Sequence, residues 1–237
     1  MSQTTLNLVA ITIFTLVMTS LLGPLLHLSP FVPAVVTFGI LSVATLDTLS
    51  WRGQVGNLVV DWFASFSAEH RARVVQHEAG HFLAAHLLEI PVTGYTLSAW
   101  ESFRQGQPGR GGVSFALEPL EFQLQQGQST QLSTQLLDRF CTVWMAGIAA
   151  EQLTYGNAEG GGDDRLKLRL LWSQLKRPDS EGALKERWAL LQAKTLLESN
   201  RVAYDALVTA MAQRVPVEAC KQLIEQHQAT DTNDVKS

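Results

Sequence analysis

The sequence has few cysteines, no phosphate-binding loop and no strong excess of either charge. Its two cysteines, Cys141 and Cys220, lie far apart and form neither a C-x-x-C metal pair nor a disulfide framework, so we expect two buried thiols in a reducing compartment. The formal net charge of −4 argues against nucleic acid as the main partner. No G-x-x-x-x-G-K-S/T motif occurs, which excludes ATP binding through such a loop.

Basic residues are also missing from the first part of the chain, where Asp47 is the only charged side chain before Arg52. Residues 6–26 and 31–50 form two apolar runs of about 20 residues, the length that a helix needs to cross a bilayer. The linker between them is short enough to predict a tight return. A cleaved signal peptide fits less well because no basic residue precedes the first run, and a buried hairpin of a globular protein is the other alternative.

These runs predict an integral membrane protein in which residues 1–50 form a transmembrane helical hairpin and the lipid bilayer is a partner. Arg52, Arg71 and Arg73 follow the second run, whereas the hairpin loop has no Lys or Arg. The positive-inside rule then predicts that the rest of the chain lies on the cytoplasmic or stromal side. Residues 51–66 would serve as a connector.

A helix is predicted from Ser67, a plausible N-cap, to about residue 89, before Pro91. It contains the pentapeptide HEAGH, with His77 and His81 four residues apart. This spacing places both imidazoles on one helix face, where they can bind a single zinc ion. Glu78 would act as the general base toward water.

A catalytic zinc ion usually takes three protein ligands, so a third must come from elsewhere in the chain. A second helix is predicted over residues 133–155, followed by a glycine-rich loop over 157–164. Gly80, inside the first of these helices, suggests close approach of a neighbouring backbone. The spacing alone does not choose among the acidic candidates for the third ligand, which are Glu151, Glu159, Asp163 and Asp164.

Residues 111–117 read as a short strand, and the last hundred residues as helices broken near Pro178, Asn200 and Pro216. The fold class is therefore predicted to be mainly α with a small β element. A strand at a sheet edge could hold an extended substrate through backbone hydrogen bonds. An ordinary hairpin strand is the alternative.

Several segments resemble the peptidase domain of FtsH-type zinc metallopeptidases. The HEAGH helix resembles that family's zinc helix, and the segment AGIAAEQLTYG is similar to its GGRxAEExxFG helix. The loop EGGGDDRLKLRLL resembles its TGAxNDIxxAT loop, and residues 187–214 resemble its late helices. The resemblance runs in the family's order from about residue 67 to 226. It implies a zincin-like helical peptidase domain over 67–228, followed by a disordered tail over 229–237.

Carried over position by position, the resemblance implies that His77, His81 and Asp164 are the zinc ligands and that Glu78 is the catalytic residue. Asp163 falls on the family's asparagine and is the nearest alternative ligand. Glu151 falls on a family glutamate beside the site. A variant site in which Glu151 is the third ligand remains open.

Full-length members of the family carry an ATPase module, for which the 16 residues between Ser50 and Ser67 leave no room. We therefore expect a membrane-anchored, ATP-independent zinc metalloendopeptidase that cleaves flexible or damaged membrane proteins, in a plasma or thylakoid membrane. Homo-oligomers, or hetero-oligomers with FtsH-type subunits, are further expectations. The alternative function is a catalytically weak, peptidase-like assembly factor or scaffold that pairs with such subunits or with membrane complexes.

Overall fold

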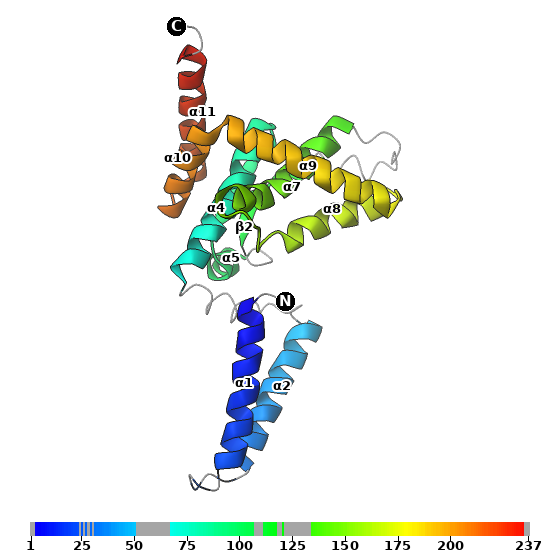
Figure 1. Cartoon of the computed structure of the whole chain (residues 1–237), viewed down its shortest axis with the longest axis vertical. Coiled ribbons are helices and arrows are strands. Elements are labelled where there is room, and N and C mark those ends of the chain that lie inside the picture. Colours follow the sequence, from blue (N-terminus) through cyan, green and yellow to red (C-terminus); the bar gives the residue numbers. More distant parts are fainter. Residues whose placement is uncertain are drawn as a thin grey trace. The chain divides into compact units, whose positions relative to one another are not determined.

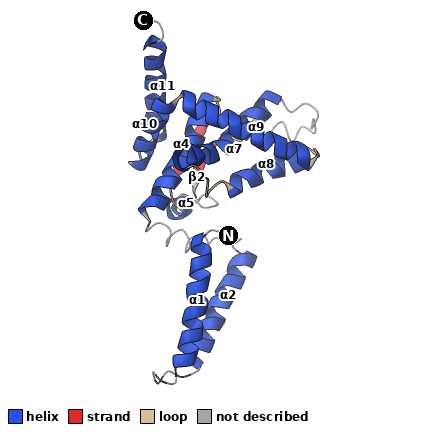
Figure 2. Ribbon diagram, viewed as in Figure 1, coloured by secondary structure: helices blue, strands red, loops and turns tan. Residues whose placement is uncertain are grey.

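The computed structural model describes residues 3–23, 25, 27, 29, 31–50, 67–106, 111–117, 120 and 134–234. They are mainly helical, with one two-stranded antiparallel sheet (Figure 2), which confirms the predicted class. The chain divides into two compact units, Met1–Ala68 with Ser98–Gly111, and Glu69–Leu97 with Gly112–Ser237. The expected connector 51–66 lies outside the described residues.

The first unit contains helices α1 (Gln3–Leu22), α2 (Phe31–Ser50) and α5 (Ala99–Arg104). Helices α1 and α2 lie side by side (Figure 1). The short helix α5 begins after Ser98, whose side chain accepts a hydrogen bond from the Glu101 backbone N–H at 3.1 Å.

The two predicted membrane spans are not borne out. Among the described residues, no helix combines the length and the apolar character that crossing a bilayer requires. Polar side chains recur within both apolar runs, for example Asn7 and Thr12 in α1 and Asp47 in α2. The prediction of an integral membrane protein with two spans, and with the remaining chain on the cytoplasmic or stromal side, is therefore wrong.

The second unit contains six helices and both strands among the residues that are described. In chain order these are α4 (Ala68–Leu87), β1 (Val92–Thr96), β2 (Gly112–Phe115), α7 (Thr134–Tyr155), α8 (Gly162–Gln174), α9 (Asp179–Ser199), α10 (Arg201–Ala212) and α11 (Val217–Asp234). Strand β1 pairs with β2, with Tyr95 opposite Val113 and a register shift between Val92 and Gly94. Helix α11 continues past residue 228, where the peptidase domain was expected to end.

Helix α7 forms the centre of this unit, since every residue from Phe140 to Glu151 is buried. It packs against α8 and α9 (Figure 1) and crosses α4 at Gly80. A Cβ atom on Gly80 would lie 2.6 Å from the Ala146 carbonyl oxygen and 2.8 Å from the Ala150 Cβ atom. The glycine therefore permits the close backbone approach that its position in a helix suggested.

Candidate metal centre

Helix α4 places His77 and His81 on one face, as residues four apart in a helix must be. Both side chains are buried, with exposed fractions of 8% and 4% for the residues. Their rings meet edge to face, with centroids 4.7 Å apart, and their Nε2 atoms are 3.0 Å apart. Two nitrogen donors thus point at the same small volume.

Asp164 completes this group from the first turn of α8. Its Oδ2 atom lies 3.2 Å from Nε2 of His77 and 3.4 Å from Nε2 of His81. The three ligand atoms lie within 4.8 Å of one another, and all three residues are buried. His77, His81 and Asp164 therefore form a group that could hold a metal ion.

The local structure around Asp164 differs from the glycine-rich loop that the sequence predicted over 157–164. Helix α8 already begins at Gly162, preceded by Gly161 in the left-handed conformation with φ of 83°. A carboxylate in the first turn is favoured by the partial positive charge of a helix N-terminus. Lys167, one turn later, donates to Oδ1 of Asp164 at 3.0 Å, which leaves Oδ2 directed at the histidines.

The other ring nitrogen of each histidine is held by a hydrogen bond. Nδ1 of His81 lies 2.7 Å from the carbonyl oxygen of Val143, to which it donates. Nδ1 of His77 lies 2.7 Å from Oε1 of Glu151, which also accepts from the backbone N–H of Gly160 at 3.1 Å. Such bonds to Nδ1 fix the ring orientation and leave Nε2 as the atom that could bind a metal ion.

The electrostatics of the group favour a positive charge at its centre. Burial alone would lower the pKa of His77, but hydrogen bonds to Asp164 and Glu151 and the nearby charge of Glu78 outweigh it and raise this pKa to about 10. Burial alone would raise the pKa of Asp164, whereas His81, His77 and Lys167 hold it well below its usual range. A proton or a metal cation would therefore be stabilised between these side chains.

Two glycines make room for the rings. A Cβ atom on Gly147 of α7 would overlap Nε2 of His77 and lie 2.5 Å from Nε2 of His81. A Cβ atom on Gly160 would lie 2.6 Å from Oε1 of Glu151 and 3.1 Å from Nδ1 of His77. The donor set and the space around it thus fit a small cation with nitrogen and oxygen ligands.

Glu78 points toward strand β2. Its Oε2 atom accepts a hydrogen bond of 2.9 Å from the backbone N–H of Val113. Gly112 allows this approach, because a Cβ atom there would lie 3.3 Å from the same oxygen. Phe115 of the same strand packs against His81, with ring centroids 6.4 Å apart. The strand that the sequence predicted therefore lies directly beside the histidines and Glu78.

The structure does not bring the remaining acidic candidates to the metal position. Asp163 and Glu159 are exposed. Glu151 contacts Nδ1 of His77, on the opposite side of the ring from Nε2, which excludes it as a third ligand alongside Asp164. Its pKa is lowered, because contacts with His77 and two backbone N–H groups outweigh the effect of burial. Glu151 therefore contacts the His77 ring from its Nδ1 side and does not belong to the group that could hold a metal ion.

Sequence reasoning missed the residues that shape the centre through space or backbone groups rather than through a reactive side chain. Gly147 lies within AGIAAEQLTYG. A glycine inside a helix next to a predicted site could have indicated that the site needs space there. The backbone contacts of Val143 and Val113 had no signal in the sequence. They depend on how helices and strand pack.

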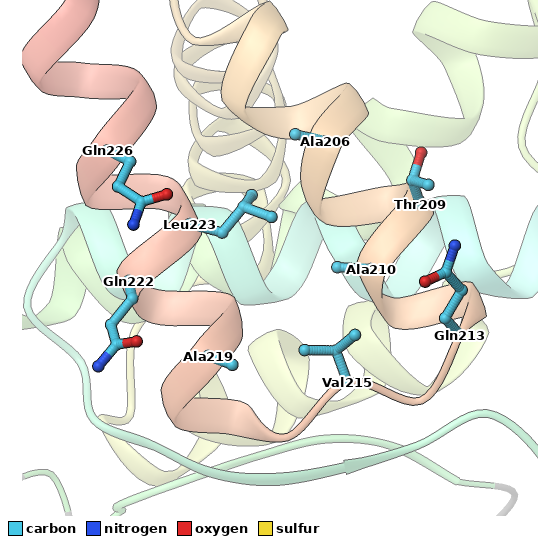
Figure 3. A pocket seen from close by; sticks show the side chains of 9 residues that line it. All are labelled: Ala206, Thr209, Ala210, Gln213, Val215, Ala219, Gln222, Leu223 and Gln226. Carbon is cyan, nitrogen blue, oxygen red and sulfur yellow. The ribbon is translucent and has the colours of Figure 1, made fainter.

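A separate hollow of about 510 Å³ lies between α10 and α11 (Figure 3). Its lining has no acidic, basic or histidine side chain. The residues are Ala206, Thr209, Ala210, Gln213, Val215, Ala219, Gln222, Leu223 and Gln226. The hollow therefore offers no ligands of the kind gathered around His77.

Comparisons with known proteins do not extend this description. No protein-family model, no curated protein and no solved structure matches the chain. The assignment to the FtsH-type peptidases therefore stays a prediction that rests on the motifs.

Proposed function

We propose that this chain is a zinc metalloendopeptidase of the HExxH type, with an FtsH-like, zincin-type peptidase domain. The observation that carries the proposal is the convergence of His77, His81 and Asp164 beside Glu78. Two imidazole nitrogens and one carboxylate oxygen are a typical protein ligand set of a catalytic zinc ion, which keeps one position open. Zinc held there would polarise a peptide carbonyl and lower the pKa of water.

Glu78 would act as the proton carrier of this reaction. Its carboxylate would take a proton from the attacking water and pass it to the amine that leaves when the peptide bond breaks. The Val113 N–H group holds one of its oxygens, so the other is available for the proton. Phe115 shields the neighbouring His81 on the side of the strand.

The substrates would be flexible polypeptide segments. Strand β2 has one partner strand among the described residues, β1, and a substrate in extended conformation could align with its other edge. The sequence has no phosphate loop with which to drive unfolding by ATP. We therefore propose ATP-independent cleavage of chains that are already unfolded.

The test uses the full chain and the Glu78→Gln variant, with a disordered casein as substrate. We expect about one zinc ion per chain by elemental analysis in both proteins. Loss of the general base should slow cleavage by about 10²–10⁴-fold in the variant. Equal cleavage by both proteins, or a purified chain that takes up no zinc, would contradict the proposal.

A further inference from the structure

Arg73 lies on α4 one turn before His77, and its side chain is only 12% exposed. Among the described residues its buried Nε atom has no hydrogen-bond partner, and it lies 3.6 Å from Oε1 of Glu69 on the same helix. Burying a charged guanidinium is unfavourable unless oppositely charged groups surround it. The groups that contact Arg73 therefore show what stabilises its buried positive charge.

These contacts reach two other segments. On α7, the guanidinium carbon lies 4.2 Å from the centre of the Tyr155 ring, and Nη1 lies 3.7 Å from Oε2 of Glu151. In the segment between α7 and α8, Nη1 donates to Oδ1 of Asn157 at 3.3 Å and Nη2 lies 3.7 Å from Glu159. We call Arg73, Glu151, Tyr155, Asn157 and Glu159 the Arg73 cluster.

The cluster connects directly to the candidate metal centre through Glu151. One oxygen of this carboxylate, Oε1, contacts Nδ1 of His77, and the other, Oε2, faces Arg73 and accepts from the Glu159 N–H at 2.8 Å. The segment that Arg73 and Glu151 hold in this way leads within a few residues to Asp164. Arg73 thus contacts both α7 and the segment between α7 and α8.

We infer that Arg73 is a positioning residue, which fastens the segment before Asp164 to the helix that carries His77 and His81. The inference rests on the proposed metal site, but it does not require that the site cleaves peptides. Without the guanidinium, Glu151 loses the positive charge next to its Oε2 atom and the segment loses two of its attachments to α4. The geometry of the His77 ring and of Asp164 then becomes less well defined.

The experiment measures Co²⁺ affinity by chelator competition in the wild type and in Arg73→Met, Arg73→Lys and Arg139→Met. Arg139 is the matched control, because it forms another Arg–Glu pair, with Glu89 at 3.0 Å, that links α7 to the chain just beyond the other end of α4. We expect Arg73→Met to weaken Co²⁺ binding about tenfold or more, the usual cost of losing a group that supports a ligand. Arg73→Lys should lose less, and Arg139→Met should bind like the wild type.

A double-mutant cycle separates positioning through Glu151 from a general loss of stability. In the Glu151→Gln background, Arg73→Met should weaken Co²⁺ binding less than it does in the wild type, because the carboxylate that links Arg73 to His77 is already lost. Equal losses in both backgrounds, or equal affinities of Arg73→Met and Arg139→Met, would overturn the inference.

A third readout needs no metal. Glutamyl endopeptidase should cleave after Glu159 faster in metal-free Arg73→Met than in metal-free wild type or Arg139→Met, because the segment is less firmly attached. Unchanged cleavage would overturn the inference. If the wild type binds Co²⁺ and these results hold but casein is not cleaved, only the proposed function fails.

Discussion

Gly147 is the residue that leaves space for both histidine rings. It belongs to the buried stretch of α7, and a Cβ atom there would overlap Nε2 of His77. The Nε2 atoms of His77 and His81 are the proposed metal ligands. Even one methyl group at position 147 would displace at least one of the two rings from the metal position. The helix itself would accept alanine at position 147, because alanine has the higher helix propensity. The restriction to glycine therefore comes from the two histidine rings.

We predict that Gly147→Ala lowers zinc affinity about tenfold or more while the helical content stays unchanged. The measurement is chelator competition for the metal together with circular dichroism. Gly39→Ala is the control, since among the described residues no atom outside the backbone of α2 lies within 4 Å of a Cβ atom at Gly39. Wild-type zinc affinity in Gly147→Ala would show that the ion does not bind between the two Nε2 atoms.

The two cysteines are buried as the composition suggested, and burial governs their reactivity. It raises the pKa of Cys141 to about 12 and also raises the pKa of Cys220. Only the thiolate reacts with disulfide reagents, and the thiolate fraction grows as pH rises toward the pKa. At pH 8, a thiol with a pKa near 12 is ionised in about one molecule in 10⁴.

We therefore predict that the folded chain reacts slowly with a chromogenic disulfide reagent at pH 8 and that the rate increases with pH. In guanidinium chloride both thiols should react at once. The measurement is the time course of thiol release at several pH values. Rapid labelling of Cys141 in the folded protein would contradict the buried position of this residue.

The HEAGH pattern allowed His77 and His81 to be predicted as neighbours, because helix geometry alone brings residues four apart together. The place of Glu78 followed from the motif. Asp164 could be selected only through the resemblance, since spacing left four acidic candidates. The contact of Glu151 with His77 could not be derived from the sequence. It depends on α7 crossing α4, a tertiary contact that no local pattern encodes.

At the scale of elements, the crossing of α4 and α7 determines whether the centre can form. The two helices approach closely at Gly80, where a Cβ atom would lie 2.6 Å from the Ala146 carbonyl oxygen. Helix α4, which carries both histidines, is thereby held against α7, which supplies the Val143 carbonyl and the Glu151 carboxylate. A wider separation would remove both supports from the histidine rings.

We predict that Gly80→Ala destabilises the fold despite the better helix propensity of alanine. The propensity favours alanine by about 1 kcal/mol, whereas overpacking of a core typically costs about 1–3 kcal/mol. Urea unfolding should show a lower midpoint with an unchanged slope. Gly39→Ala, whose Cβ atom meets no neighbour in the described part of the chain, should not lower the midpoint. A Gly80→Ala midpoint at or above the wild-type value would argue against the close crossing.

Helix boundaries could be predicted well where proline or a change of periodicity marks them. The helix expected from residue 67 to 89 spans Ala68–Leu87, and the one expected over 133–155 spans Thr134–Tyr155. The breaks near Pro178, Asn200 and Pro216 also appear in the structure. The start of α8 was missed because three glycines usually indicate a loop. Here Gly160 packs against Glu151 and Gly161 against Ile148, which the sequence could not show.

At the scale of the whole molecule, metal binding and folding stability are linked. A cation that binds the folded chain and not the unfolded one stabilises it, by about 2.7 kcal/mol when the free metal exceeds its dissociation constant about 100-fold. For a chain of this size, such a gain raises the melting temperature by about 5–10 °C. The same gain is lost when a chelator removes the ion.

We predict that EDTA lowers the melting temperature of the zinc-loaded chain by this amount and that added zinc restores it. The Glu78→Gln variant should show the same shift, because Glu78 is not a ligand. His81→Ala should show none. Differential scanning calorimetry provides the measurement, and a wild-type melting temperature that does not respond to EDTA would contradict the proposed site.

His77 and Asp164 are 87 residues apart in the chain, yet their side chains meet at 3.2 Å. An ion between them would act as a reversible cross-link that closes a long loop, and folding has already met the entropy cost of bringing the ends of that loop together when the ion binds. The cross-link forms only after α8 has docked beside α4. Zinc would consequently bind late in folding, and its release would first free the glycine-rich segment while the buried helix α7 keeps its packing.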